Sequence, residues 1–210
     1  MSEFLTEEEQ VERLKQWWKE NGRSIIAGVV IGLGVFGSWQ GWRAYQIQQA
    51  EAGAAAYDAF AARASAGDLG ATLEAESSLQ NAFADTAYSN LAAFETARQL
   101  VNNDRLDEAA ERLQYIYEKG SNVAIRQLAR VRLARVLMGQ GKLDDAVRIL
   151  EGDVPSAYAG EVALLRGDLA RLQGDDAAAR SAYQQAQAAG AGDQEWLQLM
   201  VQNLAGNEPG

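Results

Sequence analysis

The feature that most constrains this chain is a stretch of 19 residues without a charged side chain, from Ser24 to Trp42. As an α-helix the stretch would be about 28 Å long, which matches the roughly 30 Å of hydrocarbon in a lipid bilayer. Tryptophans precede it at Trp17 and Trp18 and mark its end at Trp39 and Trp42, where amphipathic rings favour the headgroup region. We therefore predict a transmembrane helix over residues 24–42.

Basic residues near the span predict its orientation. Four of them precede it, whereas only Arg43 follows it directly, so the positive-inside rule places the amino terminus in the cytoplasm. We therefore expect a single-pass protein of the bacterial inner membrane, with a cytoplasmic tail over residues 1–23, a periplasmic domain over 43–206 and a frayed end over 207–210. The main rival is a cleaved signal peptide, but no small-x-small cleavage site closely follows the apolar core. The four basic residues are Arg13, Lys15, Lys19 and Arg23.

The tail before the span has its own helical signal. Thr6-Glu7-Glu8-Glu9 is a capping-box pattern, and apolar residues follow at helical spacing. We predict an amphipathic helix that either lies on the membrane surface or docks a partner. Its apolar residues are Val11, Leu14, Trp17 and Trp18.

Glycines within the span allow two interpretations. The run from Gly32 to Gly37 matches GxGxxG, and Asp58 stands 21 residues further on, as in a dinucleotide-binding motif. That motif needs a βαβ unit, and no second strand follows Arg43, so we expect no cofactor. Two GxxxG spacings favour contact with another membrane helix instead. These glycines are Gly28, Gly32, Gly37 and Gly41.

Composition points to an all-α protein without enzymatic chemistry. Two prolines and few β-branched runs favour helices throughout. The absence of histidine and cysteine excludes imidazole catalysis, thiolate nucleophiles and the usual zinc ligands, so we expect no bound metal and no enzyme activity. A net charge of −10 repels phosphates and argues against nucleic acid as a ligand.

The chain repeats itself after residue 90, which predicts stacked helical hairpins. The series Leu91, Phe94, Ala97, Leu100 returns 37 residues later and again after a further 33, each time followed by a turn and an acidic start to a second helix. Gly141 and Gly174 supply turns, and the acids after them are expected to cap the next helices, which also explains paired carboxylates such as Asp144 and Asp145. Small residues recur where two helices must pack closely, at Ala97, Ala134 and Gly167 and at Ala109, Ala146 and Ala179.

This pattern resembles the tetratricopeptide repeat, with a period of about 34 residues. The early aromatic residue occurs only once, as Phe94, and the usual terminal proline is missing. Residues 44–83 are expected to add a poorer hairpin, and residues 193–204 a closing helix. In the repeat pattern the first helices line a partner-binding groove, although the same residues are also compatible with an ordinary core and surface. The predicted groove residues are Phe94, Arg98, Val101, Arg135, Met138 and Arg171.

Several features together point to one family. These are the acidic start, Trp17-Trp18 followed by Lys19-Glu20-Asn21-Gly22, the anchor ending in Gly41-Trp42-Arg43, and the degenerate repeats with Leu165-Arg166-Gly167-Asp168. In these the chain resembles the YfgM family, the ancillary subunits of the bacterial Sec translocon. The resemblance implies a periplasmic domain near the Sec channel, association with a membrane-anchored periplasmic prolyl-isomerase-like chaperone, and assistance to newly exported polypeptides as a scaffold or chaperone. A bitopic regulator whose cytoplasmic tail binds a soluble signalling partner is the alternative, and deletion of that tail would separate the two.

Overall fold

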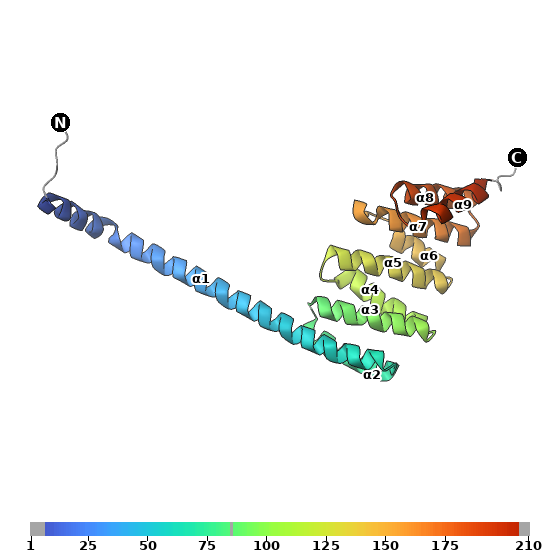
Figure 1. The fold of residues 1–210 in the computed structure, drawn as a ribbon, viewed down its shortest axis with the longest axis horizontal. Coiled ribbons are helices and arrows are strands. Elements are labelled where there is room, and N and C mark those ends of the chain that lie inside the picture. Colours follow the sequence, from blue (N-terminus) through green and yellow to red (C-terminus); the bar gives the residue numbers. More distant parts are fainter. Residues whose placement is uncertain (1–6, 85, 206–210) are drawn as a thin grey trace, which may run out of the picture. The chain divides into compact units, whose positions relative to one another are not determined.

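The computed structural model describes residues 7–84 and 86–205, and this part of the chain forms nine α-helices and no strand (Figure 1). The all-α prediction is confirmed. Contacts divide the chain into two units, an anchor unit over Met1–Ala52 and a repeat unit over Gly53–Gly210. Thr6 of the capping-box pattern and residues 207–210, predicted to fray, lie outside the described residues.

Helix α1, Glu7–Ser65, runs without a break through the predicted tail helix and the predicted span. Within the described residues it is the helix long and apolar enough to cross a membrane, and the side chains of that apolar stretch are not covered by protein. The aromatic residues beside the span pack along α1 itself. The Trp18 ring covers Gly22, and the Arg43 guanidinium lies 5.8 Å from the centre of the Trp39 ring.

Three hairpins follow one another in the repeat unit and stack side by side (Figure 1). Each pairs a first helix with a second helix across a tight turn, as the sequence period predicts. The first helices also contact each other, α3 with α5 and α5 with α7. The hairpins are α3 (Ala87–Asn102) with α4 (Leu106–Lys119), α5 (Val123–Gly139) with α6 (Leu143–Leu150), and α7 (Ser156–Gln173) with α8 (Asp176–Ala188).

The three turns share one left-handed residue. Gly141 and Gly174 have φ of 72° and 79°, and Asp104 takes the same place in the first hairpin with φ of 58°. In each case the next N–H donates to a carbonyl five residues back in the helix, as Arg105 does to Leu100 at 2.9 Å. This is the Schellman arrangement, which satisfies carbonyls that the helix end leaves free. The predicted turn glycines are therefore confirmed.

Among the three repeated hairpins, the predicted capping by acids holds for one. Asp175 caps α8 by accepting a hydrogen bond from the N–H of Ala178 at 2.8 Å. Arg105 and Lys142 occupy the same place before α4 and α6 and make no side-chain cap. Asp144 and Asp145 instead lie inside the first turn of α6, where a negative charge favours the helix dipole without closing a cap.

Small residues lie at the helix crossings in every hairpin. Ala97, Ala134, Ala109, Ala146 and Ala179 are almost fully buried. The third hairpin has Gly167 where the others have alanine, because the Tyr183 ring fills the space and would lie 2.4 Å from an added Cβ. A larger residue on one helix is thus matched by a smaller one on the other.

An additional hairpin precedes these three, as expected, but its packing starts later than residue 44. The end of α1 packs on α2 (Leu69–Phe83) through Phe60, Ala64 and Leu79. Residues 44–52 belong to the anchor unit, and the compact repeat unit begins at Gly53, after the boundary expected at residue 43. The difference arises because residues 44–52 continue the helix with largely exposed side chains.

Helix α9, Gln194–Ala205, covers the last hairpin, as predicted for a closing helix. Leu197 is fully buried against the α7–α8 core, and the Trp196 ring packs edge-on against Tyr183 at 5.6 Å. Burial and a hydrogen bond from the Tyr183 hydroxyl to Asp168 at 2.8 Å raise the pKa of Tyr183 to about 12. The phenol therefore stays protonated and donates at neutral pH.

Candidate functional site

The first helices of the repeats expose apolar side chains that the sequence pattern alone would place in the core. We call this exposed surface of α3 and α5 the stripe. Leu91 and Leu128 fall in the predicted apolar series, yet their side chains are 44% and 40% exposed. They share a helix face with Phe94 and Val131, one turn away. The sequence held a signal for this, because the third copy has Glu161 at the same place.

A pocket of about 340 Å³ opens on this stripe between α3, α4 and α5. It brings together four of the six predicted groove residues, Phe94, Arg98, Val101 and Arg135. It also includes residues that the sequence analysis did not single out as groove residues: Ala97, Asn102, Leu113, Arg132 and Val136.

The two remaining predicted residues lie elsewhere. Met138 is half-buried and packs against the main core of the repeat unit. Arg171 lines a separate depression with Asp168 and Leu172 near the end of α7. The predicted groove is therefore concentrated in the first two of the three repeats, and its third-repeat member is set apart.

The arginines of the pocket differ in their pairing. Arg98 pairs with Glu95 on its own helix, with 2.9 Å between Nε and Oε2, and this hydrogen bond holds the pKa of Glu95 below its usual range. Arg135 pairs with Glu161 of α7. Arg132 has no ion pair among the described residues, and its guanidinium lies 4.6 Å from the centre of the Phe94 ring. Burial lowers the pKa of Arg132, the neighbouring charge of Arg135 adds to this effect, and the negative charge of Glu95 opposes it.

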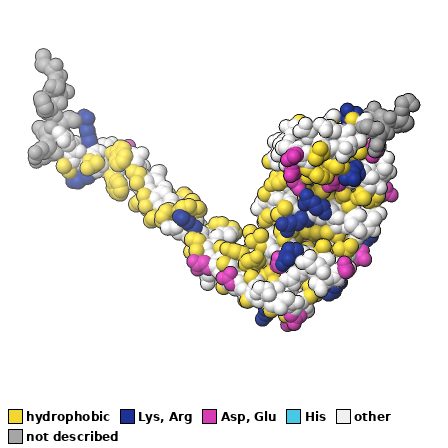
Figure 2. Space-filling view, turned by 45° about the vertical axis from the view of Figure 1, so that its right-hand side comes forward, with side chains coloured by type: hydrophobic (Ala, Val, Ile, Leu, Met, Phe, Trp, Pro, Cys, Tyr) yellow, Lys and Arg dark blue, Asp and Glu magenta, His cyan; other side chains and the backbone are white. Residues whose placement is uncertain are grey.

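This basic character is local. Figure 2 shows dark blue basic side chains beside yellow apolar ones on one face of the repeat unit, with magenta acidic side chains among them, while the chain as a whole carries a net charge of −10. None of the residues that line the pocket is acidic. The face therefore offers apolar surface and positive charge together.

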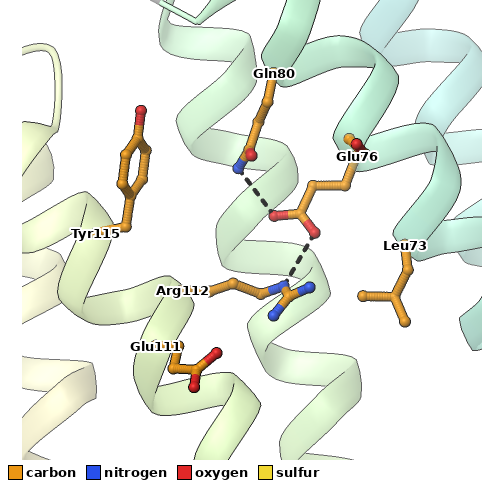
Figure 3. Close-up of a pocket in the computed structure, with 7 residues that line it drawn as sticks. Leu73, Glu76, Gln80, Glu111, Arg112 and Tyr115 are labelled. Carbon is orange, nitrogen blue, oxygen red and sulfur yellow. Dashed lines mark hydrogen bonds and ion pairs between the residues drawn. The ribbon is translucent and has the colours of Figure 1, made fainter.

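A second pocket, of about 280 Å³, lies between α2 and α4, and polar side chains that bond to one another line it (Figure 3). The carboxylate of Glu76, whose side chain is almost fully buried, points toward α4 and accepts hydrogen bonds from Arg112 at 3.1 Å and Gln80 at 3.2 Å. Burial nevertheless raises the pKa of Glu76. Because both carboxylate oxygens are engaged, this pair joins the additional hairpin to the first of the three hairpins and leaves little for a ligand.

A third polar feature stabilises the end of α6. Arg130 of α5 is 2% exposed, and its guanidinium donates to the carbonyls of Ile149 at 2.7 Å, Asp153 at 3.1 Å and Glu151. Arg166 of α7 donates to the carbonyl of Leu150. Both arginines satisfy carbonyls where α6 stops after eight residues, so they have a structural role.

The glycines of the span are open on the helix surface. An added Cβ at Gly28, Gly32, Gly37 or Gly41 would meet no other atom within 4 Å. The midpoints of the two GxxxG pairs are about two and a half helical turns apart, so the pairs lie on opposite sides of α1. Contact with one membrane helix would thus use one pair and leave the other free.

The described residues contain no cluster of acidic side chains suited to a metal ion. Two charged side chains are buried among the described residues, Glu76 and Arg130. Both make structural contacts.

Comparison with known proteins extends over nearly the whole chain. The family model of the tetratricopeptide repeat-like domain matches residues 15–206. A protein of Haemophilus influenzae is 27% identical over 97% of this chain and 100% of its own length, and one of Aggregatibacter actinomycetemcomitans is 30% identical over the same shares. A protein of Escherichia coli is 31% identical over 88% of each chain.

All three relatives are named ancillary SecYEG translocon subunits. No solved structure matches the chain. The identity and coverage of these relatives, together with the stacked hairpins and the apolar span, show that the chain belongs to the family of ancillary SecYEG translocon subunits with a tetratricopeptide repeat-like domain.

Proposed function

We propose that this chain is an ancillary subunit of the SecYEG translocon, a membrane-tethered scaffold or chaperone that binds newly exported polypeptides on the periplasmic side. The pocket on the stripe of first helices is the observation that carries the proposal. It combines an apolar lining, in which Val101 is exposed, with arginines in a chain whose relatives bear the translocon name.

The tether determines where the repeat unit acts. Four basic residues before the span and one directly after it favour a cytoplasmic amino terminus and a periplasmic repeat unit in the inner membrane. Confinement beside the channel raises the effective concentration of the repeat unit for an emerging chain. Weak contacts with many different clients then suffice for useful occupancy.

Two further partners fit this arrangement. The glycine faces of α1 suit close approach to a helix of the channel, and the repeat unit suits a membrane-anchored periplasmic prolyl-isomerase-like chaperone. We infer no enzymatic step, because the ionisable groups near the pocket are arginines and their carboxylate partners, which are suited to binding.

A photo-crosslinking amino acid placed at Val101 and, separately, at Leu128 tests this proposal in living cells. We expect crosslinks to translocon subunits, to a periplasmic chaperone or to a secreted chain arrested during export. Tyr115 on α4 is the matched control, since it is 48% exposed and does not belong to the stripe. Equal crosslinking from all three positions, or crosslinks to cytoplasmic proteins alone, would refute the role.

A regulator with a signalling tail remains the second candidate. It is favoured by the uncovered apolar side chains of Val11, Leu14 and Trp18 at the start of α1. Deletion of residues 3–20 separates the candidates. An export subunit should keep both its crosslinks at Val101 and Leu128 and its cellular effect, whereas a regulator should lose its cellular effect.

A further inference from the structure

The pocket between α3, α4 and α5 has an apolar interior and a basic rim. Ala97, Leu113 and Val136 are each at most 9% exposed and form its apolar lining, with Phe94 beside them. A volume of about 340 Å³ has room for one large apolar side chain. Arginines and Asn102 supply the polar groups that line it.

The charge of the pocket determines which residue of a ligand can stand beside that apolar side chain. The lining has three arginines and no acid. Arg98 and Arg135 already form ion pairs with carboxylates, whereas Arg132 forms none among the described residues and interacts with the charge of Glu95 only at longer range. Arg132 and Arg135 also stand one helical turn apart on α5, where like charges repel. A carboxylate brought by a ligand would relieve that repulsion and complete the pairing of the rim.

The cation–π contact with Phe94 fixes the position of the Arg132 side chain at the pocket. Its guanidinium lies 4.6 Å from the centre of the Phe94 ring, so the side chain is positioned without an ion pair. The planar guanidinium presents several N–H groups in a fixed fork and can receive a carboxylate with two hydrogen bonds. Asn102, exposed at the same pocket, offers one donor and one acceptor to a peptide backbone.

We propose that this pocket binds an extended segment of a partner polypeptide in which an apolar side chain stands beside an aspartate or glutamate, with Arg132 pairing with the carboxylate. The inference rests on the proposed function and specifies which peptide sequences the groove prefers. The preference arises in the first two repeats, because the third repeat has Asp168 in the place of Arg98 and Arg135.

Binding of labelled peptides to the full chain in detergent micelles tests the proposal. Three peptides share one Gly/Ser-rich frame and differ at the centre, which reads Leu-Asp, Leu-Asn or Ala-Asp. Fluorescence polarisation should show Leu-Asp binding about fivefold more tightly than Leu-Asn, the discrimination expected of a partly exposed ion pair. Leu-Asp should also bind more tightly than Ala-Asp, which lacks the large apolar side chain that fills the pocket. Arg132→Gln should reduce the affinity for Leu-Asp to that for Leu-Asn.

Arg148→Gln is the control for Arg132→Gln. It makes the same change in net charge on α6, at a side chain 74% exposed and outside the pocket. Both variants should keep the helical circular dichroism and the melting temperature of the parent. Equal binding of Leu-Asp and Leu-Asn, or equal losses in the two variants, would overturn the proposal in favour of unspecific attraction.

Two other results separate this inference from the proposed function. If no peptide binds while crosslinks from Val101 and Leu128 persist in cells, the acidic preference is wrong and the translocon role stands. If the peptides discriminate as expected but those crosslinks are absent, the pocket preference stands and the translocon role falls. Self-association of the unliganded chain that Arg132→Gln disperses would assign the pocket to a second copy and overturn the proposal.

Discussion

Replacing Arg130 with methionine should destabilise the repeat unit by about 3 kcal/mol. The guanidinium donates to three carbonyls at the end of α6 and just beyond it, those of Ile149, Glu151 and Asp153. Hydrogen bonds from a charged donor contribute at least about 1.5 kcal/mol each, or roughly 4.5 kcal/mol together. Methionine carries no charge, so the variant avoids roughly 1.5 kcal/mol of the cost of burying the guanidinium. The net destabilisation is therefore about 3 kcal/mol.

Thermal unfolding followed by circular dichroism measures this loss. For a unit of this size, about 3 kcal/mol corresponds to a melting temperature roughly 6 to 12 °C lower. Hydrogen exchange should locate the effect at the end of α6 and in the chain leading into α7, because the carbonyls there lose the guanidinium donor that holds this segment in place and its amides should exchange faster. Lysine at position 130 should restore only part of the stability, since one ammonium group cannot reach three carbonyls.

Arg148→Met is the matched control for this prediction. Arg148 is 74% exposed, and its ion pair in the described part of the chain is with Asp145 one turn away, so its loss should change stability by less than about 0.5 kcal/mol. A melting temperature for Arg130→Met within about 1 °C of the parent, or similar shifts for both variants, would refute the reasoning that the carbonyls depend on Arg130.

Three more predictions concern the turns, the helix crossings and the topology. Asp104→Gly should stabilise the first hairpin by about 0.5 kcal/mol, because glycine adopts the φ of 58° without strain, and a lower melting temperature would contradict it. Ala134→Leu or Ala146→Leu should destabilise the repeat unit by about 1 to 3 kcal/mol, because both residues are fully buried at helix crossings and leucine would overpack them. Ala188→Leu at the exposed end of α8 should have little effect, and equal effects of all three would show that the hairpin register is wrong. Protease added to spheroplasts should digest the repeat unit, and its protection would reverse the orientation proposed for the chain.

Patterns with a fixed period or a fixed length could be predicted from the sequence alone. The 19-residue uncharged stretch needs only a length and a count of charges, and the hairpins need only a repeat spacing. The turns at Gly141 and Gly174 follow because few residues adopt a left-handed backbone. Each of these inferences depends on residue types and spacings that can be read along the chain, without knowledge of contacts between distant residues.

Contacts between distant residues could not be predicted in the same way. Arg132 reaches Phe94, and Arg112 reaches Glu76, over separations of more than 30 residues, and nothing local marks either arginine as special. The same holds for Arg130, which the sequence presents as one of several arginines on α5. Leu91 and Leu128 were assigned to an apolar series, because periodicity alone does not tell a core face from a binding face.

Divergence between the repeats identifies the part of the stripe that is available for recognition. The crossings keep small residues in all three hairpins, whereas the position of Arg98 becomes Arg135 and then Asp168. In the third hairpin Asp168 accepts a hydrogen bond from Tyr183, and Tyr183 packs against Trp196 of the closing helix. That repeat uses this position to close the stack. The first two repeats keep arginine beside the pocket, and there we propose that a partner polypeptide is selected.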